Sequence, residues 1–145
     1  MGEKVRENTS IDASPDVVWN VITDLSRYPE WADGVRLTEV LEANEDGSPH
    51  RARFVIDAKV SEITYVIQYA YDNYDITWNL LEGDLISQLD GIYRLYETED
   101  GGTEVEYGLE VDVDLPIPHF MKKRAARTIL EQGLKGLKGQ AESQV

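Results

Sequence analysis

The spacing of apolar residues changes twice along the chain. Between Ser14 and Leu25 they recur every three or four residues, which is typical of a helix with one buried face. From Val35 to Asp114 they alternate with polar residues, as in antiparallel strands with one dry and one solvated face. After Pro118 the helical spacing returns. The pattern therefore predicts an α+β protein with a long sheet and a helix at its C-terminal end.

The beginning of the chain predicts one strand and two short helical segments. The strand is expected at Lys4–Ile11. Ser14 then suits an N-cap, Pro15 the first helical position, and Asp16 the positive end of the helix dipole. The buried face of this helix is predicted to carry Val18, Val21, Ile22 and Leu25. Pro29 disfavours helix at the residue before it, so a second short helical turn is expected at 28–31.

The alternating segments assign side chains to a dry face of the sheet. The strand at Arg51–Val60 directs Lys59 and Asp57 outward, and Glu104–Asp114 is the clearest strand, with acids on its outer face. The predicted inward residues are Ala52, Phe54, Ile56, Ala58, Val60, Ile63, Tyr65, Ile67, Tyr69, Tyr71, Ile76, Trp78, Leu80, Val105, Tyr107, Leu109, Val111 and Val113.

A hairpin is predicted between Ile86–Thr98 and the last strand. A three-residue loop at 100–102 with a left-handed glycine pairs Leu95 with Tyr107 and Tyr93 with Leu109. A two-residue loop would slip the register by one and turn Arg94 inward. We favour the first register, which keeps Arg94 outside.

The last segment predicts one amphipathic helix from about Pro118 to Glu142. Its glycines, Gly133, Gly136 and Gly139, have two interpretations: a fraying end, or a bendable segment that leaves room over a ligand. The apolar positions of this helix are Met121, Ala125, Ala126, Ile129, Leu130, Leu134, Leu137 and Ala141.

Composition narrows the function classes. The 145 residues have a net charge of -14, which repels phosphate backbones and argues against nucleic acid. No cysteine, signal peptide or membrane span is visible, so we expect one cytoplasmic domain, residues 1–145, without stable membrane insertion. Residues 119–145 hold six of the 14 basic residues, which indicates either a basic surface for a membrane or acidic partner, or a helix that complements its own acidic sheet.

Four segments of the sequence are similar to segments of a known protein family. The segment from Ser14 to Trp19, the segment Asp24–Trp31, the run Gly91–Leu95 and the turn Asp100–Val105 resemble the polyketide cyclase/dehydrase and lipid-transport family of the START-like superfamily. That resemblance implies the helix-grip fold: a curved antiparallel sheet of about seven strands, two short helices after the first strand, and a long C-terminal helix over the concave face. It implies a cavity between sheet and helix for a lipid, sterol, polyketide or quinone, and leaves the ligand unnamed.

By position in that fold, the predicted ligand-binding residues are Phe54, Ile56, Tyr65, Tyr69, Trp78, Tyr93, Tyr107, Leu109, Met121, Ile129 and Leu134. Some of these residues are expected to fill the core instead. No metal site and no cofactor is expected, because zinc spacing and phosphate-binding glycine loops are missing from the sequence. His50, in a turn, and His119, at the start of the last helix, are expected at the surface.

Three functions remain open. The first is binding or transport of a small hydrophobic molecule by a monomer or weak dimer. The second is a polyketide aromatase/cyclase or dehydrase, which needs polar groups in the cavity to polarise carbonyls and move protons. Its candidates are Gln88, Asp90, Lys59, Arg94 and the tyrosine hydroxyls. Strand parity directs Lys59 outward, and the favoured register directs Gln88, Asp90 and Arg94 outward, so the tyrosines are the main inward polar groups. Tyrosines alone suit orienting a ligand better than aldol chemistry, so we expect binding rather than catalysis. The third is a protein-interaction or quinone-chaperone module.

Overall fold

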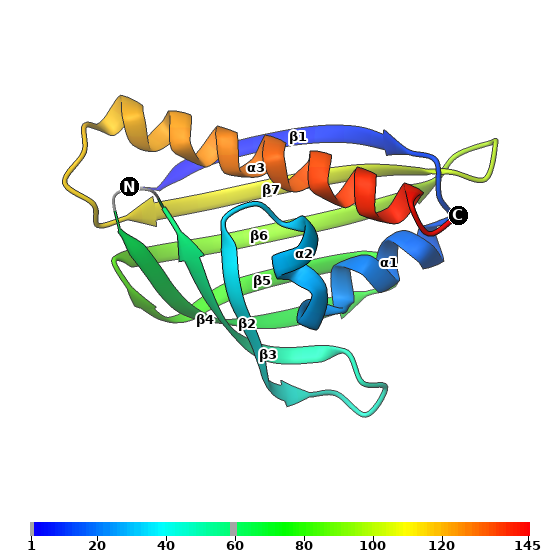
Figure 1. The fold of residues 1–145 in the computed structure, drawn as a ribbon, viewed down its shortest axis with the longest axis horizontal. Coiled ribbons are helices and arrows are strands. Elements are labelled where there is room, and N and C mark those ends of the chain that lie inside the picture. Colours follow the sequence, from blue (N-terminus) through cyan, green and yellow to red (C-terminus); the bar gives the residue numbers. More distant parts are fainter. Residues whose placement is uncertain (1, 59–60) are drawn as a thin grey trace.

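The computed structural model describes residues 2–58 and 61–145. These residues form seven strands, three α-helices and a short 3₁₀ turn at Leu25–Arg27 (Figure 1). The helices are α1 (Pro15–Thr23), α2 (Tyr28–Trp31) and α3 (His119–Glu142). The strands are β1 (Glu3–Ile11), β2 (Val35–Ala43), β3 (Pro49–Asp57), β4 (Glu62–Asp72), β5 (Asp75–Asp84), β6 (Ile86–Glu97) and β7 (Thr103–Val113).

All seven described strands join one antiparallel sheet in the order β1-β7-β6-β5-β4-β3-β2. The sheet curves, and all three helices lie on its concave face (Figure 1). Helix α3 packs mainly along β1 and more lightly on β7, α1 and α2. This is the helix-grip arrangement that the sequence predicts. Among the described residues, no helix combines the length and apolar character that crossing a bilayer requires.

Helix α1 begins where the sequence predicts. The Ser14 Oγ accepts a hydrogen bond from the Val17 amide at 3.3 Å, and Pro15 occupies the first turn. Val18, Val21, Ile22 and Leu25 are all buried, which confirms the predicted apolar face. The Pro29 segment forms the second short helix, α2, as expected.

The β6–β7 hairpin corrects the predicted register. Tyr93 pairs with Tyr107 and Leu95 with Val105, so the strands are shifted by two residues from the expected pairing. The loop still has three residues, but it covers 99–101, with Gly101 in the left-handed region at φ 83°. The Asp100 carboxylate anchors this loop by accepting a hydrogen bond from the Gly102 amide at 3.2 Å. Because a shift of two preserves the side-chain faces, the aromatic residues still point inward.

Two further expectations about the strands are wrong in part. Strand β3 ends at Asp57, so it is shorter than the predicted 51–60; Ala58 lies outside the strand, and Lys59 and Val60 lie outside the described residues. The outer face of β7 was expected to be exposed, but Glu106 keeps only 21% of its side chain accessible. Arg6 on β1 and Arg94 on β6 both form ion pairs with this carboxylate and cover it.

Helix α3 matches its predicted bounds, but not all of its predicted contacts. Ala126, Leu130, Leu134, Leu137 and Ala141 are buried as expected. Met121 and Ile129 are 42% and 46% exposed, and Ala125 is exposed as well. The reason is that α3 packs mainly along β1 at the edge of the sheet, which leaves the side of the helix that carries Met121, Ala125 and Ile129 open to solvent.

Candidate functional site

Aromatic side chains gather on the concave face of the sheet in two groups. Tyr69 contacts Trp78, Trp78 contacts both Tyr93 and Tyr107, and the two tyrosines stack at 4.4 Å between ring centroids. Phe54 stacks on Tyr65 at 5.3 Å. We call these six residues the aromatic cluster. All come from the period-two positions of β3 to β7, which explains why they share one face.

Gly91 on β6 makes room for the centre of this cluster. It pairs with Trp78 across the β5–β6 ladder. A Cβ atom at position 91 would lie 2.0 Å from Cε2 of the Trp78 indole. The indole therefore lies flat against the backbone of its neighbouring strand, and only glycine permits this close approach.

The hydroxyl groups of the cluster sit in a water-poor environment. Burial raises the pKa of Tyr69 and Tyr93 well above the usual value near 10, and it also raises the pKa of Tyr65 and Tyr107. Neighbouring tyrosines add to this effect on Tyr69 and Tyr93, because each phenolate would repel the next. These phenols therefore stay protonated at physiological pH and can donate hydrogen bonds to a carbonyl or hydroxyl group of a ligand.

Helix α3 approaches the cluster through its glycines. A Cβ atom on Gly133 would lie 3.3 Å from Cε2 of Tyr107, and one on Gly136 would lie 2.4 Å from the carbonyl oxygen of Trp31 in α2. Gly139 has open space around it. Neither interpretation from the sequence fits the first two glycines: this part of α3 is a packed helix, and Gly136 permits close contact with α2.

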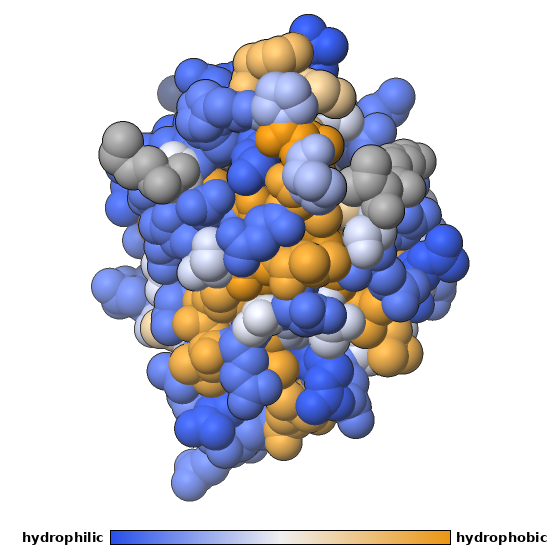
Figure 2. Space-filling view, turned by 90° about the vertical axis from the view of Figure 1, so that its left-hand side faces the viewer, coloured by the Kyte–Doolittle hydropathy of each residue, from blue (hydrophilic) through white to orange (hydrophobic). Residues whose placement is uncertain are grey.

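One end of the concave face is lined by apolar side chains that are half-buried or exposed. At this end β3, β5 and β7 end, β4 begins, and α3 begins (Figure 1). Figure 2 shows the molecule with this end toward the viewer. Apolar residues form a band there, with hydrophilic residues on either side. We call this region the apolar mouth; its residues are Val35, Ile56, Tyr65, Leu80, Val111, Val113, Ile117, Met121 and Ile129.

The residues predicted to bind ligand thus fall into two groups. Those at depth are buried and in mutual contact: Phe54, Tyr69, Trp78, Tyr93, Tyr107, Leu109 and Leu134. Ile56 and Tyr65 are half-buried at the mouth, and Met121 and Ile129 are on the exposed side of it. Met121 and Ile129 were expected to lie over the concave face from the helix side, but both are more than 40% exposed. The binding role of the whole set stays a prediction.

Sequence reasoning missed two aromatic residues of α2. Tyr28 lies 5.9 Å from Phe54 and 4.7 Å from Trp31, measured between ring centroids. The Tyr28 hydroxyl donates to the carbonyl oxygen of Ile22, which holds α2 against α1. The sequence does place two aromatic residues in the segment Tyr28–Trp31. Helical spacing alone did not show that their side chains face the sheet.

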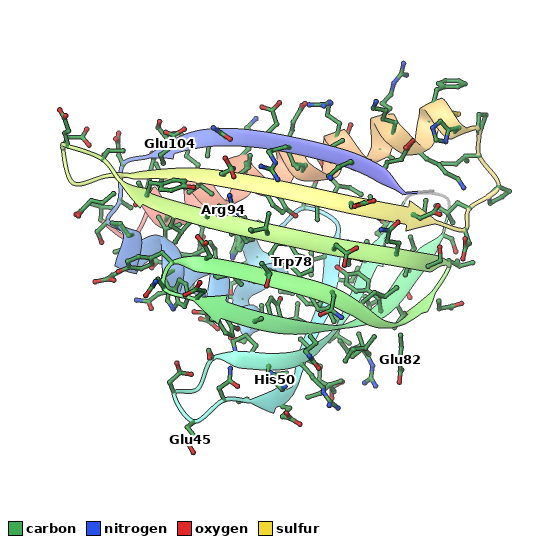
Figure 3. All side chains as sticks on the ribbon, turned by 180° about the vertical axis from the view of Figure 1, so that it is seen from behind. Glu45, His50, Trp78, Glu82, Arg94 and Glu104 are labelled. Atoms are coloured by element: carbon green, nitrogen blue, oxygen red, sulfur yellow. The ribbon has the colours of Figure 1, made fainter. Side chains whose placement is uncertain are left out.

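The polar candidates for catalysis do not join the cluster. Gln88 donates to Asp90 at 3.2 Å, and Arg94 pairs with Asp75 and Glu106 on the outer face. Figure 3 shows the molecule from behind, so that this outer face is toward the viewer, with Arg94 on β6 and Glu104 on β7. These placements confirm the outward prediction for Gln88, Asp90 and Arg94. Lys59 lies outside the described residues.

The buried polar residues of the described chain are Glu3 and Thr103. Glu3 pairs with His119 at 3.0 Å, and the Thr103 hydroxyl donates to the Ala13 carbonyl oxygen at 2.7 Å. Both interactions join elements at the edge of the sheet rather than in the cluster. His119 is largely exposed, as expected, whereas His50 lies in β3, half-buried beside Glu42, rather than in a turn.

A groove of about 530 Å³, which shares Leu80 with the apolar mouth, lies between β5 and β6. The two strands pair only from Asp75 to Asn79 on β5, and they diverge beyond that point. Leu81 is an extra residue relative to β4, and Ser87 is an extra residue relative to β7. Two such bulges bend their strands apart and open the ladder. The groove shares no residue with the predicted ligand-binding set, and the described residues include no group of acids and histidines suited to a metal.

The geometry defines a helix-grip protein with an aromatic concave face, and comparisons place it in a family. The profile described as polyketide cyclase / dehydrase and lipid transport matches residues 3–142, so the chain belongs to that family. A comparison with curated protein sequences gave no significant match.

Solved structures share the fold along almost the whole chain. A START superfamily protein from Mycobacterium smegmatis is 23% identical with a TM-score of 0.90, and the alignment covers 99% of this chain and 100% of that one. The Zhui aromatase/cyclase from a Streptomyces species is 17% identical with a TM-score of 0.80, covering 98% and 94%. A protein from Thermus thermophilus is 24% identical with a TM-score of 0.79, covering 97% of each chain.

Proposed function

We propose that this protein binds a small hydrophobic molecule, of the lipid or polyketide class, which enters at the apolar mouth and lies against the aromatic cluster. The main support for this proposal is that the apolar side chains of the concave face range from half-buried, at Ile56 and Tyr65, to buried, at Trp78 and Tyr107. Ligand sites are typically apolar concavities with a few polar groups that set orientation, and the buried phenols supply those groups.

The expected affinity follows from the area available. Burying about 300 Å² of apolar ligand surface at ~25 cal/mol/Å² gives roughly 7.5 kcal/mol before entropy costs, which permits micromolar binding. Because the deep rings already contact each other, the ligand has to separate some of them or occupy mainly the mouth. Phe120 and Met121 in the first turn of α3 are already exposed, so moving that turn uncovers little apolar surface.

A direct test is titration with an uncharged naphthalene probe whose emission rises in apolar surroundings. We expect saturable binding at a one-to-one ratio, with a micromolar Kd. Ile129→Glu places a charge in the mouth at a position that is already 46% exposed, so it should weaken binding at least tenfold without unfolding the protein. Leu37→Glu, at an exposed position on β2, is the matched control and should bind as wild type. Equal losses in both variants would contradict the proposal.

The second candidate is a polyketide aromatase/cyclase, because protonated phenols could polarise the carbonyls of a poly-β-ketone. Tyr93 and Tyr107 are the pair placed for that role, with stacked rings inside the cluster. Conversion of a poly-β-ketone thioester into aromatic product, lost in Tyr93→Phe with binding retained, would favour the enzyme. Binding without turnover would favour the carrier.

A further inference from the structure

The first turn of α3 carries large apolar side chains in contact with solvent. Phe120 is 63% exposed, more than any other aromatic residue among the exposed large hydrophobic residues of the described chain, and Met121 beside it is 42% exposed. Half-buried Ile117 lies three residues before Phe120, ahead of the start of α3. Adjacent exposed side chains of this size are costly in water and mark an interaction surface.

Basic residues follow these apolar side chains directly. Lys122, Lys123 and Arg124 come next along the helix, and the segment 119–127 contains no acid. His119 and Arg127 pair with Glu3 and Glu7 of β1. Within the described chain no carboxylate forms an ion pair with Lys122, Lys123 or Arg124, so their charges are available to a partner. We call Ile117, Phe120, Met121, Lys122, Lys123 and Arg124 the α3 tip.

We propose that the α3 tip docks on anionic lipid bilayers, with Phe120 and Met121 inserted at the level of the headgroups. Apolar side chains bordered by lysine and arginine are the combination that binds such interfaces, where each basic residue is attracted to anionic lipids. The tip stands at one end of the molecule (Figure 1) and shares Ile117 and Met121 with the apolar mouth. The exposed side chains of Phe120 and Met121 can insert into the headgroup region of a bilayer, which adapts to their shape, whereas a protein partner would need a matching pocket.

The charge of the rest of the chain sets the orientation. Outside residues 119–145 there are eight basic and 26 acidic residues, so the remaining surface is repelled by anionic lipid. Repulsion between exposed charges fades beyond a Debye length of about 8 Å at physiological salt. The protein therefore approaches a bilayer only with the α3 tip, and the apolar mouth then lies close to the lipid.

Vesicle co-sedimentation of the full chain tests this proposal, without any added small ligand. The probes are vesicles of phosphatidylcholine alone and vesicles with 30% phosphatidylglycerol. We expect binding to the anionic vesicles at least tenfold stronger than to the neutral ones, and weaker at 0.5 M NaCl. Lys122→Glu with Lys123→Glu should reduce it at least tenfold. The control, Arg51→Glu with Lys135→Glu, has the same net charge and exposed positions elsewhere and should reduce it less than threefold.

The apolar contribution is tested separately with Phe120→Ser and Met121→Ser, against Leu37→Ser as the exposed apolar control. Loss of vesicle binding only in the tip variants supports docking. Equal binding to both vesicle types, equal losses in tip and control variants, or a concentration-dependent dimer removed by Phe120→Ser without vesicle binding would each overturn the proposal. Because no small ligand is present, the result is independent of the proposed binding function.

Discussion

The Trp78 indole lies where a side chain on Gly91 would begin, with Cε2 only 2.0 Å from the Cβ position. This contact between neighbouring strands fixes the ring at the centre of the aromatic cluster, against Tyr69, Tyr93 and Tyr107. The position of Trp78 is thus set by the absence of a side chain on β6.

Gly91→Ala should therefore destabilise the fold. The added methyl group overlaps the indole, which has to leave its place among the neighbouring rings, and overpacking of this kind typically costs about 1–3 kcal/mol. Urea unfolding followed by circular dichroism measures the loss, and tryptophan emission should shift because Trp78 moves. A variant as stable as wild type, with unchanged emission, would show that Trp78 is not held by this contact.

Two glycines of α3 should respond in opposite directions to alanine. Gly136→Ala brings a methyl group within 2.4 Å of the Trp31 carbonyl oxygen, so separation of α3 from α2 should outweigh the gain in helix propensity. Gly139→Ala meets open space and should raise the free energy of unfolding by up to about 1 kcal/mol. Thermal unfolding of the two variants checks the pair. Stabilisation by both substitutions would contradict the α2–α3 contact.

Alkaline titration should separate buried from exposed phenols. Burial raises the pKa of Tyr28, Tyr69 and Tyr93 well above 10, so the folded state holds these protons more tightly than the unfolded state. Their contribution to stability is complete below pH 10 and is lost as the pH rises above it toward the folded pKa. Absorbance at 295 nm and circular dichroism, recorded together, should show these tyrosines ionising only as the fold is lost. Ionisation of all eight tyrosines near pH 10 in the intact fold would be inconsistent with a water-poor cluster.

The sequence predicted the order of elements because alternation and helical spacing record which face is buried. Capping by Ser14 and the inward face of β7 followed from local chemistry. The β6–β7 register did not, since the choice between two glycines at the turn depends on which one adopts positive φ. The exposure of Met121 and Ile129 could not be predicted either. Periodicity shows that α3 has an apolar face, but it does not show which part of that face the sheet covers.

In the proposed function an apolar ligand enters at the mouth beneath α3. The most direct measurement is a two-dimensional amide NMR titration of the protein with the uncharged naphthalene probe. We expect the largest shifts at Ile56, Tyr65 and Ile129, with smaller ones at Tyr107 of β7 and at Gly133, the residue of α3 that faces it. Shifts concentrated at Leu81, Ser87 and Asp90 would place the ligand in the β5–β6 groove instead, and this result, or no shift at a millimolar probe concentration, would contradict the account.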